Sequence, residues 1–142
     1  MSEEKTDETL EKLAKFHGHL GPYVVVGYRM GKIANREISE DPFEKEAVAM
    51  TGGDPPVSCI VDGVQYSSGC TLGKGNVEIK DNGKPTVKFR GNGKSLNATL
   101  GEKVQNLIEK AEEKDLEDLA VELFEMPEDE LLEVNNNGKQ TK

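Results

Sequence analysis

Apolar residues at helical spacing mark the first third of the chain. Leu10, Leu13 and Ala14 share one face of a predicted helix that Asp7 can cap and that ends near His17. A second helix is predicted over residues 22–37, because a proline at its first position lacks an N–H that would have no partner there anyway. Its first turns are apolar nearly all round, so this helix should be central and buried.

Two features of the second helix point to close packing. Gly27 and Gly31 are four residues apart and share a face. Each glycine costs a helix ~1 kcal/mol relative to alanine, so we expect another element to pack very close there. Arg29 lies in the same buried helix, and we expect it to form a structural ion pair with a carboxylate.

The middle of the chain alternates between strand and helix patterns. The sequence AVAMT at 47–51 predicts a short buried strand that Gly52 and Gly53 end. Asp54 and two prolines then open a third predicted helix, which runs to about Ser68 and ends at Gly69.

A β-hairpin is predicted over residues 77–90, in NVEIKDNGKPTVKFR. Alternating runs flank Asn82 and Gly83, a pair typical of two-residue hairpin turns. The sequence GNGK at 91–94 is interpreted as a surface turn.

The last third of the chain has mainly helical patterns. Apolar residues from Leu100 to Ala111 predict an amphipathic helix, and those from Leu116 to Leu123 predict another. A short turn follows from Pro127, and residues 135–142 are predicted to be a disordered tail. Residues 1–134 should therefore form a single α+β domain, with helices packed on a small, mostly antiparallel sheet.

Charge and hydropathy narrow the class of protein. The net charge is −9, so a nucleic-acid partner is not expected. No apolar run approaches the ~20 residues that span a bilayer, and no membrane association is expected. The first residues are charged and lack the apolar core of a signal peptide, which indicates a cytoplasmic protein.

Histidine and cysteine are rare and occur in two short stretches. The chain has two histidines, His17 and His19, and two cysteines, Cys59 and Cys70. In a reducing compartment, cysteines of this kind are more often metal ligands or reactive thiols than a disulfide. Two imidazoles and two thiols equal the four ligands of a structural zinc site, although they can equally be packed structural residues.

Spacing limits how these four residues can meet. If the third helix is straight and spans both cysteines, eleven residues separate them by ~16 Å, which favours a three-ligand, open centre. Cys59 near the start of the helix should have a thiolate stabilised by the helix dipole. Asp62 and Gln65, one turn further on, could orient ligands or a substrate.

The stretch SSGCTLGKGN at 67–76 allows two interpretations. Its glycines suit a tight helix-to-strand turn. Alternatively, its backbone amides with Thr71 and Lys74 could bind an anionic group. The spacing of a Walker A motif is absent.

Two motifs together resemble one known family. FHGHLGPYVVVGYRMGKIA at 16–34 and CIVDGVQYSSGCTLGKGN at 59–76 are similar to the FmdE family, named for the E subunit of formylmethanofuran dehydrogenase. Members of that family often carry a further cysteine after the histidines, where this chain has Leu20, Gly21 and Pro22. Many also carry a cysteine-rich C-terminal zinc ribbon, and this sequence resembles a short form without it.

The resemblance implies an α+β core, a homodimer and a metal-binding cleft. It places His17, His19, Cys59 and Cys70 at the metal, with zinc or another transition metal as the ion. Around them it places the remaining candidate binding residues, which are Asp62, Gln65, Thr71 and Lys74. Two cysteines cannot hold a [4Fe–4S] cluster in the usual way, so the chain would not be the pterin-bearing catalytic subunit.

Three functions remain open at this point. The first is a metal-binding accessory subunit associated with a larger formylmethanofuran dehydrogenase-type complex in methanogenesis-type one-carbon metabolism. The second is a stand-alone metalloenzyme acting on a small anionic molecule, and the third is a purely structural subunit.

Overall fold

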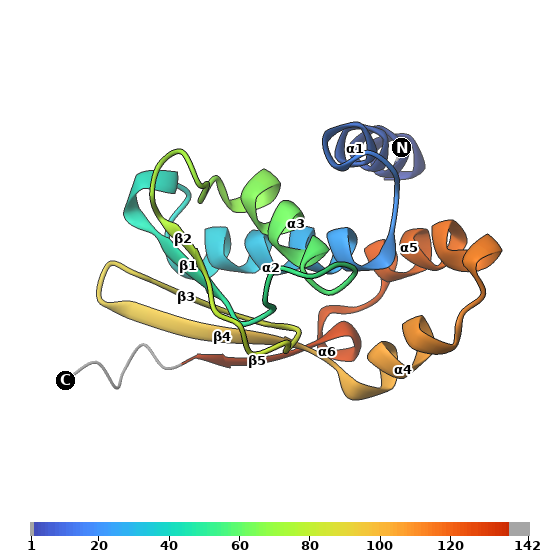
Figure 1. The fold of residues 1–142 in the computed structure, drawn as a ribbon. Helices are drawn as coiled ribbons and strands as arrows, with labels where there is room; N and C mark the ends of the chain where they lie inside the picture. The colour runs from blue at the N-terminus through green and yellow to red at the C-terminus, as the bar shows by residue number, and fades with distance from the viewer. Residues whose placement is uncertain (1, 137–142) are drawn as a thin grey trace.

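The computed structural model describes residues 2–136, with side chains from residue 8 onward. In this range, helices are packed against a five-stranded mixed sheet, as expected for an α+β fold (Figure 1). The α-helices are α1 (Ser2–His17), α2 (Pro22–Glu37), α3 (Cys59–Ser68), α4 (Glu102–Lys110), α5 (Leu116–Glu125) and α6 (Glu128–Leu131), with 3-10 turns at Pro42–Glu44 and Glu113–Asp115. The strands are β1 (Glu46–Ala49), β2 (Val77–Ile79), β3 (Thr86–Gly91), β4 (Lys94–Leu100) and β5 (Leu132–Asn136).

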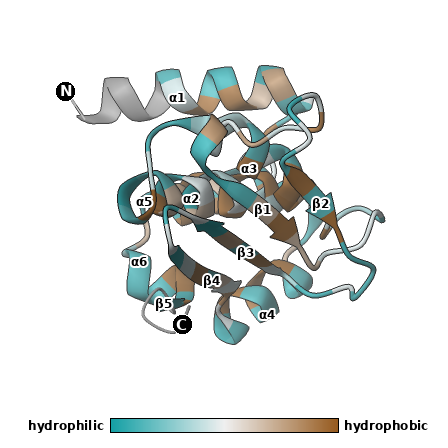
Figure 2. Ribbon diagram, turned by 90° about the vertical axis from the view of Figure 1, so that its left-hand side faces the viewer, coloured by the Kyte–Doolittle hydropathy of each residue, from teal (hydrophilic) through white to brown (hydrophobic). Residues whose placement is uncertain are grey.

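The sheet buries one face and leaves the other in solvent. Its strand order is β2-β1-β3-β4-β5, parallel between β1 and β2 and antiparallel elsewhere. The register aligns Ala47, Phe89 and Leu96 across three strands, and all three are buried. The next residues, such as Lys88 and Arg90, are exposed, as the two-residue period of a strand requires. In a second view α1 lies beyond α3, farthest from the strands (Figure 2).

Helices α2 and α3 are in backbone contact through glycines. A Cβ at Gly27 would collide with the carbonyl oxygen of Ile60, and one at Gly63 would collide with the carbonyl oxygen of Val24. At Gly31 a Cβ would meet the Ser67 hydroxyl. The close packing predicted from Gly27 and Gly31 is therefore confirmed, and α3 contributes a glycine of its own.

The hairpin predicted over 77–90 is wrong. β2 and β3 do not pair with each other, because β1 lies between them and pairs with both. Asn82 and Gly83 do turn the chain, with Gly83 at φ +64, but the turn passes around the end of β1. With β1 between β2 and β3, its residues Ala47 and Ala49 are buried in the core, which a local β2–β3 pair would not achieve.

The hairpin in this fold joins β3 and β4, at the predicted surface turn. Asn92 and Gly93 have φ values of +53 and +73, which suits the primed turns that connect antiparallel strands. The sequence pattern does not predict β4, and it places the last residue of this strand, Leu100, in the following helix. That helix, α4, begins two residues later at Glu102.

Two other element boundaries differ from expectation. α3 begins at Cys59 after a turn over residues 55–58, because prolines lack the N–H and disfavour helical geometry in the residue before them. Asn135 and Asn136 extend β5 along β4, whereas the rest of the predicted tail, 137–142, lies outside the described residues.

Arg29 does not find the carboxylate that we expected. Its Nη1 atom donates hydrogen bonds to the carbonyl oxygens of Leu123 (2.8 Å) and Phe124 (2.9 Å), near the C-terminal end of α5. Carbonyls in the last turn of a helix have few donors within the helix, and that of Leu123 accepts only a long bond from the Met126 N–H (3.4 Å), so the guanidinium caps α5 and ties it to α2. Burial lowers the pKa of Arg29 from its ordinary value.

Among residues 2–136, none of the helices combines the length and the apolar character needed to cross a membrane.

We predict that Gly63→Ala destabilises the protein by about 3 kcal/mol or more, because the new methyl group must push α2 away from α3. Denaturant unfolding measures the change. The control is Gly73→Ala, whose Cβ would point into open space, with an expected change within about 0.5 kcal/mol. Equal stability of the two variants would refute the close packing of these helices.

Candidate functional site

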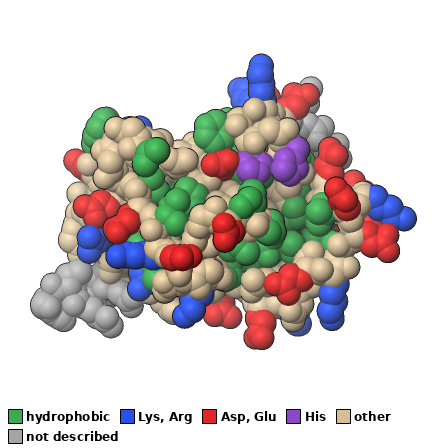
Figure 3. All heavy atoms as spheres, in the orientation of Figure 1, with side chains coloured by type: hydrophobic (Ala, Val, Ile, Leu, Met, Phe, Trp, Pro, Cys, Tyr) green, Lys and Arg blue, Asp and Glu red, His purple; other side chains and the backbone are tan. Residues whose placement is uncertain are grey.

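One cleft contains both histidines and one cysteine. It has a volume of about 730 Å³ and lies between the end of α1, the starts of α2 and α3, and the segment joining α4 to α5. Its lining includes His17, His19 and Cys59. In the space-filling view the two histidines border a surface of apolar side chains, with carboxylates near its margin (Figure 3). Residues from distant parts of the sequence therefore meet at this position.

His17 is held by a hydrogen bond between α1 and α3. Its Nδ1 atom lies 2.6 Å from Oδ2 of Asp62, and its side chain is only 9% exposed. The carboxylate accepts a hydrogen bond from Nδ1–H, so in a neutral imidazole the proton is on Nδ1 and Nε2 is left unprotonated. Within the described residues Nε2 has no hydrogen-bond partner.

His19 and Cys59 complete the imidazole and thiol groups of the cleft. The ring centroids of His17 and His19 are 5.0 Å apart. His19 is exposed, and Gly21 leaves room for its ring, since a Cβ there would lie 3.2 Å from Nε2. Across the described residues, however, no three His, Cys, Asp or Glu side chains are already arranged to hold a metal ion.

The environment of Cys59 favours its neutral thiol. Burial raises the pKa of Cys59 above its ordinary value, and the nearby Asp62 carboxylate raises this pKa further. This direction is opposite to the one expected from the helix dipole, although Cys59 is the first residue of α3.

Cys70 lies at the other end of α3. It follows Gly69, which ends the helix with φ +82, and its side chain is fully buried. It does not line the cleft. Burial raises the pKa of Cys70, which is typical of a packed thiol, although Ser68, Lys45 and Lys74 lower it in part.

The backbone N–H groups of the glycine-rich loop at 67–76 donate hydrogen bonds within the protein. The N–H groups of Thr71 and Leu72 donate to Oδ1 of Asn76 and Oε1 of Gln65, and the N–H of Lys74 donates to Thr71. The Lys74 ammonium lies over the ring of Phe43, 5.6 Å from its centroid. An anion bound by these amides would have to replace the internal hydrogen bonds.

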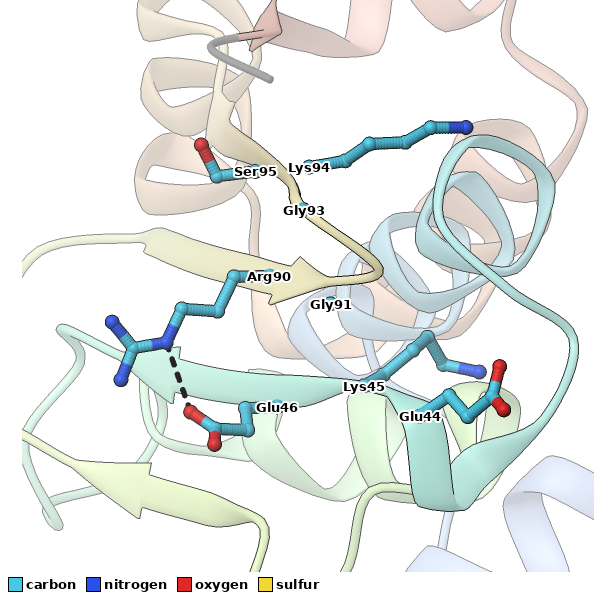
Figure 4. A pocket seen from close by; sticks show the side chains of 8 residues that line it. All are labelled: Glu44, Lys45, Glu46, Arg90, Gly91, Gly93, Lys94 and Ser95. Atoms are coloured by element: carbon cyan, nitrogen blue, oxygen red, sulfur yellow. Dashed lines mark hydrogen bonds and ion pairs between the residues drawn. The ribbon is translucent and has the colours of Figure 1, made fainter. Parts of the chain in front are cut away.

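Two further cavities flank the sheet. One, of about 590 Å³, is lined by Asp62, Gln65 and Leu72 together with residues of β2. The other, of about 460 Å³, contains Lys45, Arg90 and Lys94, and there Nε of Arg90 donates to Oε1 of Glu46 at 2.9 Å (Figure 4). Neither contains a histidine or cysteine.

Sequence reasoning missed one wall of the cleft. Tyr23 lines it from α2. Three glutamates line it from α4, the 3-10 turn after it and α5, and they are Glu109, Glu113 and Glu117. The glutamates recur every four residues, which is the only local signal they give, and this spacing is also typical of a solvated helix face.

The fold and the cleft define a small α+β protein with imidazole and thiol groups at a shared cleft. Residues 16–133 match the family described as "FmdE, Molybdenum formylmethanofuran dehydrogenase operon". The chain belongs to this FmdE family, which confirms the resemblance inferred from its two motifs.

Two individual proteins are also similar to the chain. An FmdE-like protein of the tungsten formylmethanofuran dehydrogenase type, from Syntrophus aciditrophicus, has a crystal structure that matches with a TM-score of 0.70 and 24% identity, covering 92% of this chain and 71% of that one. This similarity supports the fold. A probable S-adenosyl-L-methionine-binding protein from Archaeoglobus fulgidus is 36% identical over 85 residues, which are 56% of this chain and 22% of that protein. The chain thus spans about a fifth of that relative's length.

We predict that Asp62→Ala changes the tautomer of His17. With its acceptor removed, the neutral ring should shift from mainly Nδ1–H toward mainly Nε2–H. Long-range ¹H–¹⁵N correlation spectra, recorded where the ring is neutral, distinguish the two forms. Asp118→Ala, an exposed carboxylate on α5, is the control. An unchanged His17 tautomer in the Asp62 variant would contradict the assigned hydrogen bond.

Proposed function

We propose that this FmdE-family chain is a cytoplasmic metal-binding protein, associated with a formylmethanofuran dehydrogenase-type enzyme of one-carbon metabolism. His17, His19 and Cys59 would hold the ion, with zinc as the first choice. The observation that supports the proposal is that these three side chains, from α1, the loop after it and α3, line one cleft.

The groups present suit a transition metal in their chemistry. Two imidazoles and one thiolate are a common ligand set for zinc, and also suit other transition metals. Nε2 of His17 has the free electron pair that a metal needs, and the Asp62 hydrogen bond is the kind of contact that orients a ligating imidazole. Because these side chains do not yet form a ligating group, binding requires the exposed His19 and the half-buried Cys59 to rotate.

Burial of Cys59 has a consequence for metal binding. The raised pKa of Cys59 keeps the thiol protonated in the free protein, so the metal must displace that proton. Cys70 is not needed, because α3 places it at the far end of ten helical residues. An ion held by three protein ligands keeps a position for another molecule, and a cleft of about 730 Å³ leaves space for one. This space favours an open centre, and with it a stand-alone metalloenzyme as the second candidate function.

We predict that zinc-reconstituted protein binds about one equivalent of zinc and that His17→Ala or Cys59→Ser lowers this below about 0.2 equivalent. Metal analysis after removal of loosely bound ions measures both. Cys70→Ala is the matched control and should retain zinc, and circular dichroism checks that each variant is folded. Less than about 0.2 equivalent of any transition metal in the folded wild type would overturn the metal proposal.

The assembly is part of the same proposal, and we place the chain in a homodimer. Exposed apolar side chains beside the edge strand β2 support a protein contact, since Leu72 is 80% and Ile79 is 48% exposed. Apolar residues of this kind at an open sheet edge favour association.

We predict that the purified chain has twice the mass of one chain by size-exclusion chromatography with light scattering, and that Leu72→Lys with Ile79→Lys shifts it toward one. Lys84→Glu with Lys88→Glu, two exposed positions, is the control. Capture of the tagged chain from its own cells should also recover subunits of a molybdenum or tungsten enzyme. A monomer that captures no such subunit would contradict the assembly while leaving metal binding intact.

A further inference from the structure

The segment that joins α4 to α5 brings only negative charge to the cleft. Its charged residues are Glu109, Glu113 and Glu117, and neither lysine nor arginine is among the described residues that line the cleft. The three carboxylates come from the last turn of α4, the 3-10 turn after it and the first turn of α5. The three glutamates lie together at the cleft because the chain turns between α4 and α5 at this place.

These carboxylates have no internal counterion. In residues 8–136 none of the three takes part in an ion pair, and the nearby Lys114 is paired with Glu112. Burial raises the pKa of Tyr23, a hydrogen bond with Gln105 lowers it in part, and the Glu109 carboxylate adds a smaller upward effect. The charge of Glu109 therefore reaches Tyr23, which also lines the cleft.

Most of the other residues that line the cleft are apolar. Leu20, Pro22, Ile108 and Leu116 contribute hydrocarbon surface, and Ile108 is only 7% exposed. The lining also includes the nine-tenths buried His17, whose Nε2 has no hydrogen-bond partner within the described residues. The cleft thus combines an apolar surface, an acceptor nitrogen from the end of α1 and three carboxylates from the segment that joins α4 to α5. Its volume of about 730 Å³ is in the range of small-molecule sites.

We propose that this cleft binds a small organic cation, with an ammonium-type group near Glu109, Glu113 and Glu117 and an apolar body against Leu20, Pro22, Ile108 and Leu116. An anion here would meet three carboxylates with no cation among the lining residues to offset them. This inference rests on the proposed function only in placing the functional site at this cleft. It differs from the anionic ligand expected from the glycine-rich loop, whose amides have internal partners.

A matched pair of probes tests the sign of the charge. Tryptamine is a cation at neutral pH, and indole-3-propionate is an anion of the same shape. We expect tryptamine to bind at least about tenfold more tightly at about 20 mM salt, with the difference shrinking as salt screens the carboxylates. Titration followed by ¹H–¹⁵N spectra reports both the affinity and the location, with the largest shifts expected at Tyr23, Ile108 and Leu116.

Charge-removing variants separate the cleft from the net charge of the protein. Glu109→Gln, Glu113→Gln and Glu117→Gln together should reduce the preference to less than about twofold. The matched control combines Glu122→Gln, Glu125→Gln and Glu133→Gln, which removes the same charge from exposed positions outside the cleft and should leave the preference in place.

The titrations are run on zinc-loaded protein and on protein treated with a chelator. Equal affinity for the two probes, shifts located elsewhere, or an equal effect of the control variant would overturn the inference. A cation preference that persists in protein unable to bind zinc would support the inference while the metal proposal fails. Zinc binding without any preference between the probes would support the metal proposal and overturn the inference of a cation site.

Discussion

The backbone contact between α2 and α3 determines where the functional groups lie. Gly27 and Gly63 allow the two helices to approach until carbonyl oxygens occupy the space of a side chain. α3 carries Cys59 and Asp62 in its first turn, and α2 begins directly after the loop that holds His19. A wider spacing of these helices would move the thiol and the carboxylate away from the imidazoles. The cost of glycine in a helix is thus offset by packing that also builds the cleft.

The sequence predicts the helices of this fold better than its sheet. The helical patterns of residues 22–37 and 116–123 follow from apolar residues that repeat every turn, which is a local property. Strand pairing is non-local, so Asn82-Gly83 and Asn92-Gly93 look alike in sequence although only the second closes a hairpin. β1 prevents the first pair from closing a hairpin, because it brings its buried alanines between β2 and β3 and pairs with both strands. No local rule predicts that a strand from far upstream will enter a hairpin pattern.

The candidate site was predictable in its residue types but less so in its electrostatics. Rare histidines and cysteines in glycine-bounded motifs indicate which side chains to follow. The helical distance between Cys59 and Cys70 favours a centre that only one of them joins, although Cys70 remained among the candidate ligands. The helix dipole alone predicts a stabilised Cys59 thiolate, whereas burial and the Asp62 carboxylate raise the pKa of this thiol. The acidic wall could not be predicted, because glutamates spaced by four residues on a charged chain are typical of any solvated helix. Only the fold brings them into the same cleft as the imidazoles.

The position of β1 between β2 and β3 also bears on how the chain reaches this structure. β3 and β4 are joined by a tight turn, so their pairing closes a very short loop and loses little chain entropy. β1 instead pairs with Val87 through Ala49, after α3 and the whole glycine-rich segment have been traversed. Contacts of such high sequence separation raise the contact order of the domain and slow its folding. Until β1 docks, two strand edges stay open to other chains, so the step that completes the sheet is also the one most exposed to aggregation during synthesis.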